Sequence, residues 1–323
     1  MLARMHQILV TALAIALAAG APAAAQDGRP LLAPGAKWEK VADDLEFGEG
    51  PAWHPDGYLL FQDVPRSRTM RLDAEDRVSV AREPTGRAVG IAFDAEGRLV
   101  ACEGNSSEGG RRVVRIEPDG RLTVLADRWA GKPLNSPNDL AIDRRGRIYF
   151  TDPRYSKREQ IEQDRDAVYR IDPDGGLTLV IDSLTRPNGI LVTPDGRTLY
   201  LADNAAPGGV VKLWAFDLDA RGDTANGRVL HDFGGGRGID GMALDADGRL
   251  WATAGTKEKA GVYVFVPDAG RGAAALALFL PIPEDPTNCT FGGSARDVLY
   301  VTTTSSLYRI RTAVQGHEGP PGK

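Results

Sequence analysis

Six positions recur along the sequence at steps of 40 to 52 residues, each just ahead of an apolar stretch that reads as a strand, and five of the six carry a side-chain oxygen. The six positions in this register, termed the ring positions, are Glu49, Val89, Asn138, Asn188, Asp240 and Asn288. Asn and Asp often precede strands simply because they form turns. That explanation fails for Glu49, because glutamate is a poor turn former. We therefore expect the ring positions to form one site.

The side chains at the ring positions supply two carboxylates and two or three amide carbonyls, which are hard oxygen donors. No histidine or cysteine occurs among them, and this composition suits Ca²⁺ better than zinc or copper. Glu49 and Asp240 together would balance the charge of a divalent cation. We therefore predict Ca²⁺ as the cofactor, with Mn²⁺, Zn²⁺ or Mg²⁺ as the alternatives.

The segment 134–153 shows which elements position these residues. It reads as a buried strand, a tight turn at Arg145-Gly146 and a second strand that returns beside the first. The same frame occurs six times, and the internal copies add a third and a fourth strand, such as residues 112–116 and 122–125. Four antiparallel strands per copy are typical of a propeller blade. The sequence therefore predicts an all-β fold, a six-bladed β-propeller with four antiparallel strands per blade.

The sixth copy lacks a fourth strand. Residues 37–41 alternate polar and apolar side chains and can fill this place, which would join the two ends of the chain and close the ring. In a propeller the first strand of each blade is the innermost, so the ring positions should converge at one end of the central channel.

A second group of acidic residues ends the second strand of four copies. Because these strands run antiparallel to the first strands, their ends return to the face that carries the ring positions. The residues are Asp63, Glu103, Asp152 and Asp203. Most of them should bind the backbone of neighbouring loops, while Asp152 and Asp203 are candidates for orienting the metal ligands or carrying a proton.

Composition and missing motifs exclude several classes of function. The net charge is −5 and the basic residues are scattered, so the chain has no electrostatic footprint for nucleic acid or an anionic membrane. No nucleophile elbow, dinucleotide fingerprint or P-loop is present. His54 lies five residues from Glu49, roughly 16 Å along a strand, so no histidine is placed as a base. Metal-assisted chemistry on a small molecule remains. Cys102 and Cys289 fall in non-adjacent copies, and we expect no disulfide between them.

The first 25 residues read as a cleaved export signal. A basic Arg4 precedes an apolar run over 8–19 and the small residues 23–25, a pattern that signal peptidase recognises. The run is shorter than the roughly 20 residues that span a bilayer. We therefore expect a signal peptide at 1–25, a lead-in at 26–36, the propeller at 37–311 and a flexible tail at 312–323. The mature protein should be periplasmic or secreted, without membrane contact.

Short motifs in blade order resemble those of the gluconolactonase and regucalcin family of six-bladed propellers. They are Glu49-Gly50-Pro51-Ala52-Trp53, Cys102-Glu103 with Arg111-Arg112-Val113, Ser136-Pro137-Asn138-Asp139, Thr151-Asp152-Pro153, Arg186-Pro187-Asn188-Gly189 and Asp240-Gly241-Met242. The resemblance extends over 37–311. It implies a divalent-metal-dependent lactonase whose metal ligands correspond to Glu49, Asn188 and Asp240, with Asn138 at the metal or the substrate.

Two departures from the family pattern affect the substrate. Ser136 stands where the animal members of the family have an arginine, and Gly104 stands where bacterial members often have a histidine. The charged loop 154–166 is expected to emerge at the metal face and cover the pocket. Arg154 and Tyr155 on this loop, together with Glu103, are the expected substrate contacts.

These observations predict a calcium-dependent hydrolase of sugar-type lactones, acting as a monomer or weak oligomer. The metal would polarise the lactone carbonyl, and Asp240 would act as base or nucleophile. A metal-dependent phosphotriesterase or aryl-esterase on the same site is one alternative. A non-catalytic propeller that binds carbohydrate or protein and holds a structural metal is another.

The export signal gives a direct test. Because the small-residue pattern ends at Ala25, the exported protein should begin at or near Gln26. Mass spectrometry of the exported protein checks this, and an intact Met1 start would contradict it.

Overall fold

The computed structural model describes residues 28–104, 109–155, 162–205, 209, 211–268 and 272–317. The expected signal peptide at 1–25 lies outside the described residues. Within the described ranges, no helix has the length and apolar character needed to cross a membrane.

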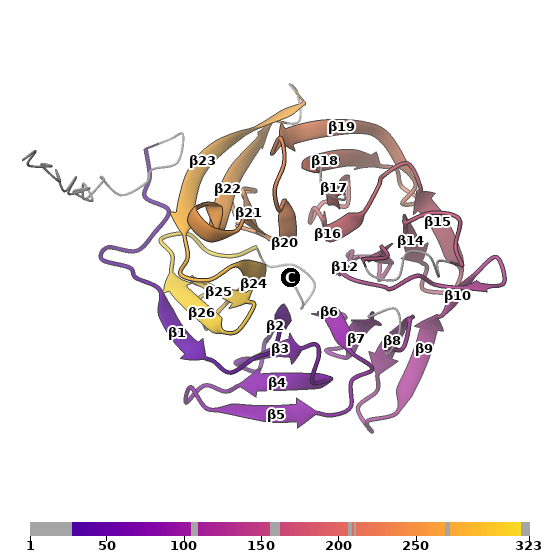
Figure 1. Cartoon of the computed structure of the whole chain (residues 1–323), viewed down its shortest axis with the longest axis horizontal. Coiled ribbons are helices and arrows are strands. Elements are labelled where there is room, and N and C mark those ends of the chain that lie inside the picture. The colour runs from indigo at the N-terminus through magenta and orange to yellow at the C-terminus, as the bar shows by residue number, and fades with distance from the viewer. Residues whose placement is uncertain are drawn as a thin grey trace, which may run out of the picture.

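Six four-stranded antiparallel sheets surround a central axis, as Figure 1 shows, so the expected six-bladed β-propeller is confirmed. Blade 1 consists of β2 (Gly48–His54), β3 (Tyr58–Asp63), β4 (Arg68–Leu72) and β5 (Val78–Arg82). Blade 2 consists of β6 (Ala88–Phe93), β7 (Leu99–Glu103), β8 (Arg112–Ile116) and β9 (Leu122–Ala126). Blade 3 consists of β12 (Leu140–Ile142), β13 (Ile148–Asp152), β14 (Ala167–Ile171) and β15 (Leu177–Ile181).

The second half of the ring repeats this order, with the first strand of each blade nearest the axis (Figure 1). Blade 4 consists of β16 (Pro187–Val192), β17 (Thr198–Asn204), β18 (Val211–Leu218) and β19 (Thr224–Asp232). Blade 5 consists of β20 (Ile239–Leu244), β21 (Leu250–Ala254), β22 (Gly261–Asp268) and β23 (Ala273–Pro281), with the 3-10 turn η2 (Lys257–Lys259) between β21 and β22. Blade 6 consists of β24 (Pro286–Gly292), β25 (Val298–Thr303), β26 (Leu307–Arg311) and the N-terminal β1 (Glu39–Ala42).

The turns between the first and second strands of blades 2, 3 and 5 are held in the same way, by an aspartate carboxylate. In blade 3, the Asp143 carboxylate accepts the backbone N–H groups of Arg145 (2.8 Å) and Arg147 (3.0 Å) and also binds the Arg147 guanidinium (2.6 Å). Gly146 in this turn has a φ of 77°, which a glycine adopts at little cost. The carboxylate therefore fixes the turn and keeps its own charge paired.

The ring is closed by the N-terminal strand, as expected. β1 pairs antiparallel with β26 and becomes the outer strand of blade 6. Two ion pairs hold it there, Arg309 with Glu39 (2.9 Å) and Lys40 with Glu284 (3.0 Å). The first and last parts of the chain thus share one sheet, so that neither end leaves an open edge at the seam.

The described parts of the lead-in and the tail, residues 28–36 and 312–317, are held against the blades, whereas the sequence predicts a flexible tail. Leu31 is fully buried in an apolar cluster with Trp251 and Phe291, and its carbonyl accepts the backbone N–H of Ala313 (2.9 Å). The described end of the tail also binds the ring, since the backbone N–H of His317 donates to Leu244 (2.9 Å). Both segments are ordered because they cover an apolar cluster that blades 5 and 6 leave open.

Both cysteines are buried and neither forms a disulfide, as expected from their separate blades.

The lead-in therefore contributes to stability. Leu31→Ala should lower the free energy of unfolding by about 2 to 5 kcal/mol, because it removes buried methyl groups and leaves a cavity. Chemical denaturation measures the change. Leu276→Ala, at a position that is 48% exposed, is the matched control and should stay within about 0.5 kcal/mol of the unmodified protein. Equal stability of both variants would contradict the anchoring role of Leu31.

Candidate metal and active site

β-bulges aim the ring positions into the channel. The register between the first and second strands shifts at the ring position in β2, β6, β16 and β20, and just before it in β24. In blade 3, β12 begins only at Leu140, after the ring residue Asn138. A bulge leaves extra backbone unpaired and turns its side chain away from the regular sheet face. Threonine hydroxyls compensate in three blades, accepting the backbone N–H of Asp139, Gly241 and Asn288 at 3.0 to 3.1 Å.

Glycines follow several of the ring residues because the innermost backbones approach closely. A Cβ on Gly50 would overlap the carbonyl oxygen of Val89, and a Cβ on Gly189 would overlap the carbonyl oxygen of Asp240. A Cβ on Gly241 would overlap the amide of Asn288. Each first strand therefore packs directly on the next one around the axis.

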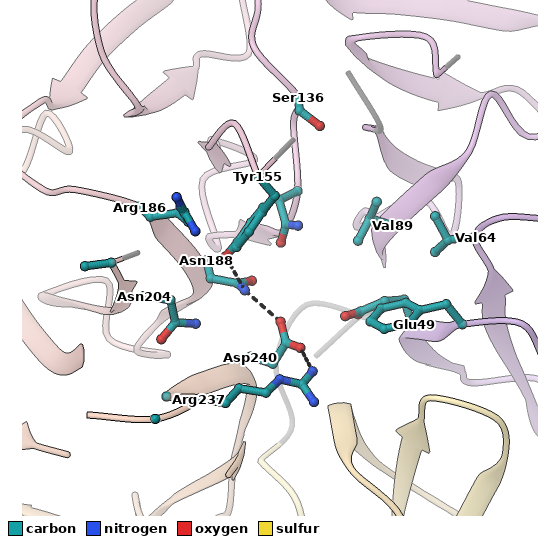
Figure 2. A pocket seen from close by; sticks show the side chains of 15 residues that line it. Glu49, Val64, Val89, Ser136, Tyr155, Arg186, Asn188, Asn204, Arg237 and Asp240 are labelled. Atoms are coloured by element: carbon teal, nitrogen blue, oxygen red, sulfur yellow. Dashed lines mark hydrogen bonds and ion pairs between the residues drawn. The ribbon is translucent and has the colours of Figure 1, made fainter. Parts of the chain in front are cut away.

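A cavity of about 520 Å³ opens at this end of the channel. Five of the six ring positions line it, while Asn288 does not. Figure 2 shows Glu49 facing Asn188 and Asp240 across the cavity. The complete lining is Phe47, Glu49, Val64, Val89, Ser136, Asn138, Tyr155, Arg186, Asn188, Asn204, Ala205, Gly236, Arg237, Gly238 and Asp240.

Glu49 is a buried carboxylate in an unfavourable environment. Its Oε2 accepts the backbone N–H of Gly50 (2.9 Å) and the side-chain amide of Asn288 (3.2 Å). Burial, and then the neighbouring charge of Asp240, nevertheless raises the pKa of Glu49 to about 8. A cation between the two carboxylates would remove this cost.

The Asp240 carboxylate is held by two donors, one at each of its oxygens. Its Oδ1 accepts the amide N–H of Asn188 (2.7 Å), and its Oδ2 pairs with the Arg237 guanidinium (Figure 2). The Asn188 amide nitrogen also donates to the hydroxyl of Tyr155 (2.7 Å). With its nitrogen engaged on that side, the oxygen of Asn188 is available as a ligand.

The donor set fits a hard divalent cation. The carboxylates of Glu49 and Asp240 and the amides of Asn138 and Asn188 all line the cavity, and they offer only oxygen as ligands. Within the described part of the chain, no three His, Cys, Asp or Glu side chains are grouped so as to hold a metal ion. A cation here would therefore depend on the amide oxygens as well as on the two carboxylates.

The outer carboxylates bind loop backbones and do not line the cavity. Asp152 accepts the backbone N–H groups of Asn135 (2.8 Å) and Ser136 (2.7 Å), although burial raises its pKa to about 7. Asp203 accepts the backbone N–H of Arg186 (2.8 Å). Asp63 does the same in blade 1, for Glu46 and Phe47. These carboxylates position the loops that carry the cavity residues Ser136 and Arg186.

Glu103 does not reach the cavity, in contrast to its expected contact with the substrate. Its carboxylate pairs with Arg112 on the adjacent strand β8 (2.6 Å). Gly86 and Gly110 pack so closely on this carboxylate that a Cβ on either would overlap it. The opposite charge on β8 and this tight packing direct the side chain away from the channel.

The two residues of the loop 154–166 that are expected to contact the substrate differ in their position relative to the cavity. Tyr155 lines the cavity, whereas Arg154 does not, is only 1% exposed and donates to the carbonyl of Asn135 (3.3 Å). Residues 156–161 lie outside the described ranges, so the expected cover over the pocket stays a prediction. The described end of the loop is attached beside blade 3, where Gln163 donates to the short hairpin of β10 (Arg128–Trp129) and β11 (Lys132–Pro133) at 2.9 to 3.2 Å.

Sequence reasoning missed several cavity residues, above all Arg237. It lies in a glycine-rich segment three residues before Asp240, which offered no strand pattern to place it. Arg186 was noted only as part of a motif, and Asn204 ends β17 one residue beyond Asp203. A search for charged or amide side chains within three residues of a ring position would have found both arginines.

Comparisons with known proteins agree with this geometry. The family model described as SMP-30/Gluconolactonase/LRE-like region matches residues 47–305. A gluconolactonase of Zymomonas mobilis is 32% identical over 86% of this chain and 82% of its own length, and a regucalcin of Xenopus laevis is 28% identical over 81% and 85%. The solved structure of a gluconolactonase from Xanthomonas campestris is 32% identical, with a TM-score of 0.75, covering 90% of this chain and 91% of that one. The resemblance seen in the sequence motifs is thereby confirmed.

The close packing of the innermost strands can be tested at two glycines. Gly50 (φ 45°) and Gly57 (φ 88°) both adopt left-handed conformations, but only Gly50 has a neighbouring backbone in the way of a Cβ. Gly57→Ala should cost about 1 to 2 kcal/mol from backbone strain alone. Gly50→Ala should cost about 3 kcal/mol or more, because the ring must also expand. Urea denaturation of both variants checks this, and equal losses would contradict the packing argument.

Proposed function

Because the chain belongs to the SMP-30/gluconolactonase/LRE-like family, we propose that it hydrolyses sugar-type lactones. The observation that carries this proposal is the convergence of Glu49 and Asp240 with Asn138 and Asn188 in one cavity. Its volume of about 520 Å³ is in the range of small-molecule sites.

We further propose Ca²⁺ as the resident cation, held by Glu49, Asp240, Asn188 and Asn138. All four residues offer oxygen, and the buried Glu49 carboxylate, beside the like charge of Asp240, would be stabilised by a cation. When bound, a divalent cation would supply Lewis-acid polarisation of the lactone carbonyl.

Asp240 is the proposed proton acceptor. A water oxygen would attack the carbonyl carbon while Asp240 takes one proton from that water. Asp240 would then return this proton to the ring oxygen as the bond between the carbonyl carbon and the ring oxygen breaks, which yields the open hydroxy acid. Asn188 and Arg237 fix the orientation of the Asp240 carboxylate for this step. Val64 and Val89 form an apolar wall of the cavity on the side of Glu49 (Figure 2).

We also propose that the protein acts in the periplasm or outside the cell. The proposal rests on the signal-like pattern of residues 1–25.

The alternatives can be separated by substrate and by chelation. Turnover of δ-gluconolactone that is lost with chelator and restored with calcium would support a metal-dependent lactonase. Faster turnover of a phosphotriester or an aryl ester would favour the esterase alternative. Calcium binding without turnover of any of these substrates would favour a non-catalytic binding propeller with a structural metal.

The two carboxylates should respond differently to substitution. Glu49→Gln keeps an oxygen but removes one negative charge, so metal affinity should fall at least tenfold and excess calcium should restore part of the rate. Asp240→Asn also keeps an oxygen but cannot accept the proton, so the rate should stay at least 100-fold low at saturating calcium.

A calcium titration of the lactonase rate, with calorimetric metal binding in parallel, measures both effects. Recovery of the unmodified rate by Asp240→Asn at saturating calcium would show that Asp240 is a ligand only. The proton would then pass to another group.

A further inference from the structure

Two arginines line the cavity, although a neutral lactone has no negative charge for them to bind. Arg186 and Arg237 both line it, on the side that blades 4 and 5 form (Figure 2). Arg237 is paired with Asp240. In contrast, the Nε of Arg186 is buried and has no hydrogen-bond partner among the residues that the structure describes.

Arg186 is held in place although its Nε has no hydrogen-bond partner within the described ranges. Its backbone N–H donates to Asp203 (2.8 Å), and its carbonyl accepts the backbone N–H of Asn204 (2.9 Å). Its guanidinium lies over the ring of Tyr155, 5.1 Å from the ring centroid. The fold thus orients this cation toward the cavity without neutralising it, which is the arrangement expected for a ligand contact.

Arg186 is also close to the proposed reaction centre. The hydroxyl of Tyr155 binds Asn188 (2.7 Å), and Asn188 binds Asp240 (2.7 Å). Arg186 precedes Asn188 by two residues, roughly 7 Å along an extended chain. One small molecule can therefore span the distance between the carboxylate pair and Arg186.

A bound divalent cation would increase the positive character of the cavity. It would offset the negative charges of Glu49 and Asp240. Arg237 would stay paired with Asp240, so only the guanidinium of Arg186 would lack a carboxylate partner among the described residues. Asn204 adds an acceptor to the same cavity, since its Oδ1 is buried without a hydrogen-bond partner in the described ranges. A ligand that is anionic and hydroxylated at this end would satisfy both groups.

We propose that the site selects lactones of sugar diacids, whose second carboxylate binds Arg186 and whose hydroxyl groups reach Asn204. This proposal rests on the lactonase function proposed for the same cavity. A carboxylate is favoured over a phosphate because its single charge matches one guanidinium, and its planar shape matches the guanidinium fork. A phosphate ester carries about −1.5 to −2 charges and would need a further free cation.

The test compares the γ-lactones of D-glucaric and D-gluconic acid, which differ in the terminal carboxylate. The unmodified protein should show a kcat/KM at least tenfold higher for the glucaric lactone. Arg186→Gln should lower the ratio of the two kcat/KM values by about 10- to 100-fold, the range expected for a hydrogen bond to a charged group. Arg186→Lys keeps the positive charge but lacks the planar pair of N–H donors. Its ratio of kcat/KM values should therefore lie between those of the unmodified protein and Arg186→Gln.

Arg144→Gln is the matched control. Arg144 is exposed on the turn between β12 and β13, away from the cavity, and its substitution removes the same charge. This variant should keep the ratio of the unmodified protein. Thermal melts of all variants confirm that each protein is folded.

Calorimetry with the open-chain anions gives a readout that does not depend on turnover. In the presence of calcium, glucarate should bind the unmodified protein at least tenfold more tightly than gluconate, and Arg186→Gln should abolish the difference. If neither lactone is hydrolysed, the proposed function fails, while this binding difference still decides the role of Arg186.

If both lactones are hydrolysed but Arg186→Gln leaves the ratio unchanged, the lactonase stands and the selectivity proposal is overturned. A third substrate, the phosphorylated lactone of gluconic acid, tests the nature of the anion. A higher kcat/KM for it than for the glucaric lactone would overturn the assignment of a carboxylate.

Discussion

The close approach of six innermost strands around one axis is the constraint on which the site depends. Gly50, Gly189 and Gly241 have no room for a Cβ, because the next strand lies directly against them. This packing brings the carboxylates of Glu49 and Asp240 into one buried space, where burial and like charge raise the pKa of Glu49 to about 8. The electrostatic cost of the ring is thus the physical basis of the cation site that we propose at its mouth.

The acidic residues at this end of the channel form two groups, those that face the cavity and those that bind loop backbones. The inner carboxylates face the cavity, while Asp152 and Asp203 are occupied by the backbone of the loops that lead into β12 and β16. The loops they fix carry Ser136 and Arg186, which line the outer part of the cavity. Substitutions in these loops can therefore change which substrate is accepted while the inner carboxylate pair stays in place.

The sequence by itself determined the repeat, the number of blades and the closure by an N-terminal strand. These features follow from the alternation of apolar residues and from the turn residues. Both signals are local and do not depend on the rest of the fold. It also determined which residues lie at the mouth of the channel. Once the first strand of each blade is known to be innermost, the register of Glu49, Asn138, Asn188 and Asp240 places them together.

The tertiary structure alone decided where individual side chains point and which segments outside the repeats are ordered. Glu103 turns away from the cavity because Arg112 lies opposite it on β8, and Arg237 enters the cavity because it pairs with Asp240. Leu31 is buried because it covers an apolar surface of blades 5 and 6, which the local sequence around Leu31 does not predict. These side-chain orientations and this burial depend on residues that only the closed ring brings together. The interaction energies that decide them therefore cannot be inferred from residues nearby in the sequence.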